Sequence, residues 1–190
     1  MTLSRNLSIL ANNVSSTGGL TGQTLTSPTI NTPIMGGSVI TSGTSQASTS
    51  GTSIDFTGIP SWVKRITVMF RGVSTSGTSI LLVQLGVLGT PTTSGYLSAS
   101  TNSTPTSNNY TTGFGLGSNS AANIVHGNLI ITNITGNSWT ASGILAASNS
   151  AGSWYFGGSI ALAGVANLVR ITTVNGTDTF DAGSINILYE

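Results

Sequence analysis

Residues 168–190 read LVRITTVNGTDTFDAGSINILYE, which has the form of a strand, a turn and a second strand. The residues of 171–174 alternate with the period of two expected for a pleated strand rich in β-branched side chains. Asn175 and Gly176 follow, and this pair tolerates the positive φ angles that tight turns require. The run therefore predicts a β-rich domain whose core is closed by its final strand.

Four charged residues fall inside this run: Arg170, Asp178, Asp181 and Glu190. Asp178 and Asp181 could act as paired carboxylates or hold calcium, but they have no third acidic neighbour to complete a calcium cage. The favoured interpretation is structural. The two aspartates are expected to cap turn amides beside Gly176 and Gly183 and to pair with Arg170.

Further segments have the same strand character, and no window of the sequence has a convincing helical pattern. Strands are expected at 54–56, 63–73, 79–87, 96–99, 110–116, 124–133, 138–147, 152–163, 168–175 and 184–189. In the second of these, Ile66, Val68 and Phe70 are expected to face one way. Short strands at near-regular spacing predict an all-β fold, with residues 54–190 forming an antiparallel β-sandwich or jelly-roll head.

The composition is unusually poor in charge. Only 5% of the 190 residues are charged and the net charge is +1, whereas about a quarter of residues are charged in typical proteins. The chain therefore lacks the field needed to hold nucleic acid. Because a monomer with so few surface charges would be poorly soluble, much of the surface is expected to be buried against other subunits.

The sequence has few residues of the types that catalysis or metal binding requires. The chain has no cysteine and one histidine, so disulfides, Cys-based metal sites and His clusters are excluded, and no cofactor is predicted. A serine nucleophile would need a base, and His126 is the only histidine; a single histidine flanked by a strand pattern is interpreted as structural. The longest apolar run, 80–83, is far below a membrane span, and no signal peptide is recognised, so membrane insertion and secretion are not expected.

Residues 1–22 are predicted to form an arm that docks on a larger assembly. Their apolar side chains fall at spacings of four, three and four, which would place them on one face of a helix. These candidate docking residues are Leu3, Leu7, Leu10 and Val14. The alternative is an extended arm that becomes ordered only on docking.

Residues 23–53 are interpreted as a thin fibrous shaft. Pro28 and Pro33 exclude a regular helix or sheet interior. One chain cannot bury the sparse apolar residues of this segment, whereas three chains wound about a common axis can. The predicted core of such a trimeric shaft is Leu25, Ile30, Ile34 and Val39. The alternative is a Ser/Thr/Pro-rich linker followed by the low-complexity run 41–53.

Two blocks of the head resemble the C-terminal domain of a class of bacteriophage tail and tail-fibre proteins. They are IDFTGIPSWVKRITV at 54–68 and RITT at 170–173 together with NGTDTFDAGSINI at 175–187. The stretch LTSPTINTPI at 25–34 is similar to the repeat-like stalk that such proteins often carry before this domain. Residues 74–123 show no resemblance, so no functional residue can be carried over.

The resemblance implies a homotrimeric virion appendage, made in the cytoplasm of the bacterial host and attached to other virion proteins through its N-terminus, with the β-rich head distal. We expect the head to bind a glycan or a protein of the bacterial cell surface, with a glycan as the favoured receptor. The irregular stretch 89–109 is interpreted as a functional or mobile loop. Side-chain amides can hydrogen-bond to sugar hydroxyls, and aromatic rings can pack against the apolar face of a pyranose. The candidate receptor-binding residues are therefore Tyr96, Asn108, Asn109 and Tyr110.

Two other functions remain open at this stage. One is a purely architectural virion protein, such as a head fibre, decoration or collar protein, that binds only other virion subunits. The other is a polysaccharide depolymerase, which needs at least two carboxylates facing a groove. The chain has four acidic residues in all, so enzymatic activity ranks last.

Overall fold

The computed structural model describes residues 40–102, 107–118 and 120–190. All regular elements within these ranges are β-strands, so no described segment is a helix able to cross a membrane. The predicted all-β class is therefore confirmed for this part of the chain. The predicted docking and shaft-core residues lie outside the described residues: Leu3, Leu7, Leu10, Val14, Leu25, Ile30, Ile34 and Val39.

The strands follow one another with short connections. In chain order they are β1 (Thr41–Ser42), β2 (Gln46–Ala47), β3 (Ile54–Thr57), β4 (Arg65–Thr75), β5 (Leu81–Val87), β6 (Thr90–Pro91), β7 (Leu97–Asn102), β8 (Ser107–Tyr110), β9 (Phe114–Gly115), β10 (Val125–Thr135), β11 (Ser138–Ala147), β12 (Ser153–Ala161), β13 (Ala166–Thr173) and β14 (Phe180–Tyr189). All long strands lie at or within a few residues of the predicted segments.

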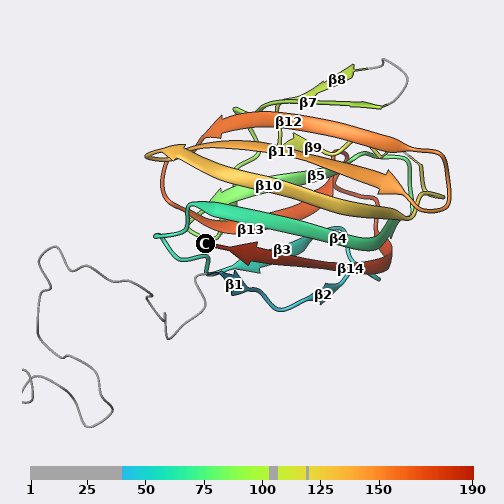
Figure 1. Cartoon of the computed structure of the whole chain (residues 1–190), viewed down its shortest axis with the longest axis horizontal. Helices are drawn as coiled ribbons and strands as arrows, with labels where there is room; N and C mark the ends of the chain where they lie inside the picture. The colour runs from blue at the N-terminus through green and yellow to red at the C-terminus, as the bar shows by residue number, and fades with distance from the viewer. Residues whose placement is uncertain (1–39, 103–106, 119) are drawn as a thin grey trace, which may run out of the picture. The chain divides into compact units, whose positions relative to one another are not determined.

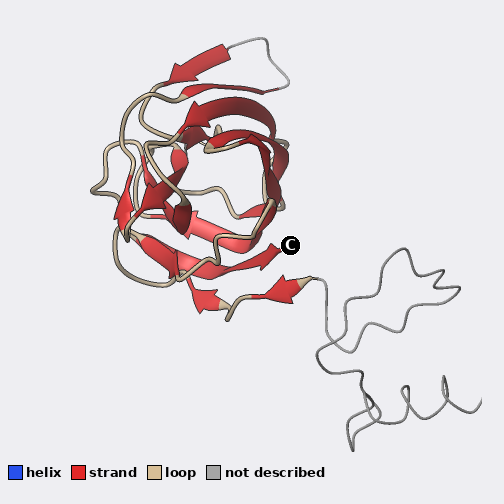
Figure 2. Cartoon of the chain, turned by 90° about the vertical axis from the view of Figure 1, so that its left-hand side faces the viewer, coloured by secondary structure: helices blue, strands red, loops and turns tan. Residues whose placement is uncertain are grey.

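The strands form two antiparallel sheets that share one interior (Figures 1 and 2). The larger, nine-stranded sheet has the order β1-β14-β4-β10-β11-β12-β7-β8, with β2 also paired to β14. The smaller, five-stranded sheet has the order β3-β13-β5-β6, with β9 also paired to β5. Strand β1 therefore lies at one edge of the larger sheet and β8 at the other.

Alternation along the strands builds the core between the two sheets. In β4, Ile66, Val68 and Phe70 are all buried, as the sequence predicted. From the smaller sheet, Val83 and Ile171 pack into the same cluster. Each such side chain contributes about 1.5–3 kcal/mol when it is fully removed from water, so this interior is the main source of stability.

The C-terminal run folds as predicted locally but not globally. Its turn is present, and Gly176 has a φ of 68°, in the region that favours glycine. The strands on either side of the turn do not pair with each other. Strand β13 lies between β3 and β5 in the smaller sheet, and β14 lies between β1 and β4 in the larger. The turn therefore carries the chain from one sheet to the other.

Two segments are more ordered than the sequence suggested. Residues 41–47, assigned to the shaft, contain β1 and β2, which pair with β14 and so pack with the head. The stretch 89–109, interpreted as irregular, contains β6, β7 and most of β8. Ser, Thr and Asn dominate these strands, so their composition resembles that of loops, and only their pairing with neighbouring strands distinguishes them.

The outer face of the smaller sheet is covered by the chain's own loops. Leu82 and Leu168 point away from the main core, yet each is only 1% exposed. Gln84 donates a hydrogen bond of 2.8 Å to the carbonyl of Thr112, which fixes a loop over this face. Thr172 donates a bond of the same length to the carbonyl of residue 52. The middle of the smaller sheet, at Leu82 and Leu168, is thus covered on its outer side as well.

Candidate binding hollow at the β7–β8 edge

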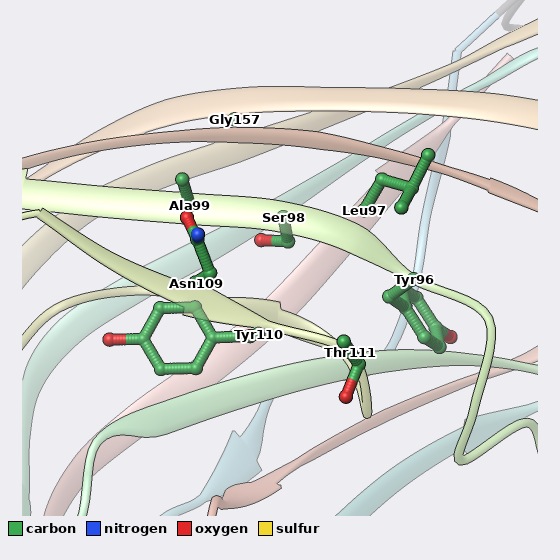
Figure 3. Close-up of a pocket in the computed structure, with 8 residues that line it drawn as sticks. All are labelled: Tyr96, Leu97, Ser98, Ala99, Asn109, Tyr110, Thr111 and Gly157. Carbon is green, nitrogen blue, oxygen red and sulfur yellow. The ribbon is translucent and has the colours of Figure 1, made fainter.

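The described surface has a hollow where β7 and β8 form the edge of the larger sheet. In Figure 1 these strands lie at the top of the domain and β1 lies at the bottom. The hollow has a volume of about 430 Å³, within the usual range of small-ligand sites. Its lining residues, drawn in Figure 3, are Tyr96, Leu97, Ser98, Ala99, Asn109, Tyr110, Thr111 and Gly157.

The strand register decides which of these side chains face outward. Ala99 pairs with Asn109 on β8 and with Gly157 on β12, so these three residues form one row across the outer face of the sheet. In Figure 3 the Asn109 amide lies beside Ala99. Gly157 contributes no side chain, which leaves a flat floor, and Leu97 stands next to it with 75% of its surface exposed.

Tyr96 holds the start of β7 against the smaller sheet. Its ring is fully buried and packs edge-on against Phe114, with ring centroids 5.0 Å apart. Its hydroxyl accepts a hydrogen bond of 2.8 Å from the Leu85 backbone N–H. Burial raises the pKa of Tyr96 above its usual value, so the phenol stays neutral. Tyr96 therefore shapes the hollow from beneath and uses its polar atom internally.

Tyr110 is also committed to packing within the protein. Its hydroxyl lies 3.0 Å from the hydroxyl of Ser100, and both side chains are buried. The ring occupies the space above Gly115, where an added Cβ would lie 2.2 Å from it. The close approach of ring and backbone explains the glycine at this position. Tyr110 is among the lining residues of the hollow, but its side chain points to the interior side of the sheet, opposite that of Asn109.

Three of the four predicted receptor-binding residues line this hollow: Tyr96, Asn109 and Tyr110. Asn108 does not line it. Because side chains alternate along β8, Asn108 pairs with Ser100 on the opposite face from Asn109. Gly157 was not predicted, because it belongs to a strand far away in the chain and only the pairing of β12 with β7 brings it here.

The hollow is uncharged, and its chemistry is that of a binding site. Its lining includes one side-chain amide and apolar groups but no carboxylate, cation or histidine. Such a surface can exchange hydrogen bonds with a neutral polar ligand and can pack against an apolar ligand face. The described lining offers no pair of acidic groups of the kind that glycoside hydrolysis uses.

Two of the carboxylates form ion pairs elsewhere, and one of these pairs corrects a prediction. Arg170 pairs with neither Asp178 nor Asp181. It binds Asp55 through two hydrogen bonds, Nε to Oδ1 at 2.7 Å and Nη2 to Oδ2 at 2.6 Å, which raise the pKa of Arg170. The reason is the pairing of β13 with β3, which sets Arg170 opposite Asp55. The second ion pair joins Arg65 to the carboxylate at position 190.

The predicted capping of turn amides is confirmed only in part, because Asp178 accepts from one backbone N–H, whereas the turn amides of Thr177 and Asp178 donate to the side chain of Asn175. Asp178 accepts hydrogen bonds from the side chain of Asn175 at 2.7 Å and from the backbone N–H of Ser79 at 2.9 Å. Because these bonds favour the charged form, they lower the pKa of Asp178. Asp181 contacts the hydroxyl of Ser74. Both aspartates therefore tie the turn between β13 and β14 to its neighbours.

Most of the other residues considered for catalysis, metal binding or sugar stacking make contacts that indicate structural roles. His126 accepts a hydrogen bond of 3.3 Å from the backbone N–H of Gly72. Within the described ranges, no three His, Cys, Asp or Glu side chains cluster as a metal site would require. Trp139 and Trp154 are buried in the core, whereas Trp62 is 55% exposed. The described residues thus leave the β7–β8 hollow as the strongest candidate site.

Comparison with known proteins adds no relative from which a function could be inferred. No protein-family model, no curated protein and no solved structure matches the chain.

Proposed function

We propose that this chain is a structural protein of a bacteriophage virion, a tail fibre or similar appendage, that attaches the particle to a glycan on the bacterial surface. The observation that carries the proposal is the uncharged hollow at the β7–β8 edge, with the Asn109 amide on its outer side. The sequence resemblance of the head and of the stretch 25–34 to tail-fibre proteins supports the same conclusion.

The hollow has the features that sugar recognition needs. The amide of Asn109 can both donate to and accept from sugar hydroxyls. Leu97 and the flat floor at Ala99 and Gly157 can receive the apolar face of a pyranose ring. One such site would bind weakly, since each hydrogen bond contributes only about 0.5–1.5 kcal/mol net. Three copies in one appendage would raise the avidity without any new contact.

The proposed particle arrangement follows from the order of the segments. Residues 1–22 dock on the virion, the shaft follows, and the head is a sandwich of the jelly-roll kind carried as a homotrimer. The sheet order supports a distal receptor site. The first strand of the head lies at one edge of the larger sheet, and the hollow lies at the opposite edge.

A second function is a purely architectural role, as a head fibre, decoration or collar protein. The observation that favours it is the broad outer face of the larger sheet, which exposes Ile144 and Tyr155 without charged neighbours on their row. Such a face suits protein partners better than sugars. In this case the hollow would have no receptor.

The test is binding of the full chain, fluorescently labelled, to an array of bacterial lipopolysaccharides and capsular polysaccharides. Gly157→Leu should fill the floor of the hollow and weaken binding at least tenfold. An added Cβ at this glycine meets nothing closer than 3.4 Å, so the strand should tolerate the change. The matched control is Ala161→Leu, which adds a similar side chain to an exposed position on the same face of the same strand.

The outcomes separate the two functions. Saturable binding that Gly157→Leu removes and Ala161→Leu retains supports glycan attachment. A folded chain that binds none of the polysaccharides but binds other virion proteins supports the architectural role. Loss of binding in both variants would mean that the hollow is not the site.

A further inference from the structure

A second cavity of the head lies at the edge opposite the β7–β8 hollow, where the edge strands of the two sheets do not pair with each other. Strands β1 and β2 end the larger sheet on this side, and β3 ends the smaller sheet. Gln46 on β2 bridges the two edges, because its Nε2 donates a hydrogen bond of 2.8 Å to the backbone carbonyl of Asp55 on β3. The cavity beside this bridge, here called the seam cleft, has a volume of about 240 Å³. Its lining residues are Gly43, Thr44, Gln46, Asp55, Phe56, Thr57, Ile59, Ile187 and Tyr189.

The floor of the seam cleft is apolar and belongs to the core. Phe56, Ile59 and Ile187 line it, and each is at most 5% exposed. Alternation along β14 places Ile187 and Tyr189 on the same, inward side of that strand. Tyr189 is only partly buried, so its ring extends the apolar floor toward the surface.

The rim of the seam cleft offers neutral hydrogen-bonding groups. Thr44, Gln46 and Thr57 contribute polar side chains. Within the described ranges, neither Oε1 of Gln46 nor the hydroxyl of Tyr189 has a hydrogen-bond partner. The bond from Gln46 shows that the Asp55 carbonyl points away from β13, so the backbone groups of Thr57, two residues on, point to the same open side. The rim therefore presents both donors and acceptors.

The charge in the seam cleft is balanced within the chain. Asp55 is the one charged residue of the lining, and Arg170 binds both of its carboxylate oxygens. An ionic ligand would find no unpaired charge there, whereas neutral hydroxyls can bond to the rim without displacing the ion pair. A peptide strand is also a poor occupant. The Gln46 side chain already occupies the Asp55 carbonyl that strand addition to β3 would use.

Trp62 lies next to the seam cleft. Its ring packs against that of Tyr189, with the centroids 6.0 Å apart and the planes inclined by 51°. Trp62 is 55% exposed, whereas Trp139 and Trp154 are buried. A pyranose has an apolar face and a rim of hydroxyls, so it suits an exposed aromatic ring beside neutral hydrogen-bonding groups.

We propose that the seam cleft binds one neutral sugar unit, with the sugar hydroxyls on Gln46 and Thr57 and the apolar face against Tyr189 and Trp62. The site goes beyond the proposed function, because it lies at the opposite edge of the larger sheet from the hollow and shares no residue with it. Its volume is below the range of about 300–1,000 Å³ that is typical of sites for larger ligands, which limits it to a single unit. Together with the hollow, it would give each head two points of contact with a polysaccharide.

The test uses the tryptophan fluorescence of the full chain. Acrylamide quenches exposed indoles, so in the native protein it should reach Trp62 and spare the two buried tryptophans. Methyl glycosides of neutral hexoses and of N-acetylglucosamine should protect Trp62 from quenching in a saturable way, and Trp62→Phe should abolish this signal. Glycerol at the same concentration should give no protection. If no glycoside protects Trp62, or if glycerol protects it equally, the proposal is wrong.

Three further variants locate the ligand. Thr57→Leu should narrow the cleft and weaken protection at least tenfold, whereas Thr132→Leu, at another exposed strand position, should leave it unchanged. Tyr189→Phe keeps the ring beside Trp62 and loses the hydroxyl, so it should weaken protection by a smaller factor. Protection that survives Thr57→Leu would place the ligand outside the cleft and overturn the proposal. Gly157→Leu, which fills the hollow, should leave protection intact, so failure of the hollow and failure of this inference can be told apart.

Discussion

The outer faces of the two sheets of the head differ in whether their apolar side chains are covered. On the smaller sheet, Leu82 and Leu168 point outward and are covered by loops of the same chain. On the larger sheet, Ile144 and Tyr155 point outward and are half exposed. Both pairs lie on the outward side of their strands. Their position on the strand therefore does not explain the difference in exposure.

The difference shows which outward apolar residues the chain covers by itself. The covered outward residues Leu82 and Leu168 contribute to folding of the single chain. On the larger sheet, Ile144 and Tyr155 stay half exposed in the single chain, so they contribute less to its folding.

Charge does not follow this division. The outward pair Arg170 and Asp55 on the smaller sheet is joined within the chain. The larger sheet also has an ion pair within the chain, between Arg65 and Glu190.

The largest expected effect is the loss of a covered outward side chain. Leu168→Ala should lower the free energy of unfolding by about 3 kcal/mol, because it leaves a cavity between the sheet and its covering loops. Urea denaturation followed by tryptophan fluorescence would measure it. Val165→Ala, three residues earlier and 51% exposed, is the control and should change stability by less than about 0.5 kcal/mol. Equal effects would remove the distinction between the covered and exposed positions.

A smaller effect is expected when the covered sheet loses its ion pair. Arg170→Gln should cost about 1 kcal/mol, because both hydrogen bonds to Asp55 are lost from a pair that is still about a third exposed. Arg71→Gln, the same substitution at an exposed position on the larger sheet, should be nearly neutral. Thermal denaturation in low and high salt would measure both. A cost for Arg170→Gln that is unchanged in 1 M salt would argue against an electrostatic origin.

The smallest expected effect is a dependence on pH at the turn between the sheets. The pKa of Asp178 is lower in the folded chain than the value of about 3.9 expected when unfolded. Its contribution to stability is therefore complete above the unfolded pKa and is lost as the pH falls through the folded pKa.

Asp178→Asn tests this dependence. The melting temperatures of the wild type and the variant should differ by a constant amount from pH 7 to about pH 5 and converge below about pH 4. Differential scanning calorimetry in matched buffers would record this. A gap that widens on acidification would contradict the stated direction of the pKa shift.

The sequence predicted the strands well because their signal is local. Alternation in β4 placed Ile66, Val68 and Phe70 on one side, and all three are buried. The uninterrupted apolar run 80–83 also contained a sign that β5 is buried on both faces, since strands of that kind do not alternate. The Asn175-Gly176 turn was located because its backbone requirement belongs to the residues themselves.

The candidate site was predicted only in part. Tyr96, Asn109 and Tyr110 were found from their position in a polar stretch, and they line one hollow. The stretch could not reveal that the tyrosine hydroxyls are used internally, or that Asn108 faces away. Those facts depend on the register between β7 and β8, which is set by pairing and cannot be read from composition.

The sequence by itself determined the all-β class, the positions of the long strands and the inward residues of β4, because backbone preference and side-chain alternation act over a few neighbouring residues. Only the tertiary structure decided that β13 and β14 belong to different sheets and that Arg170 meets Asp55. It also decided that Leu168 is covered while Ile144 is open. The physical reason is that these outcomes depend on which distant segments approach a strand, and the strand's own residues are compatible with either.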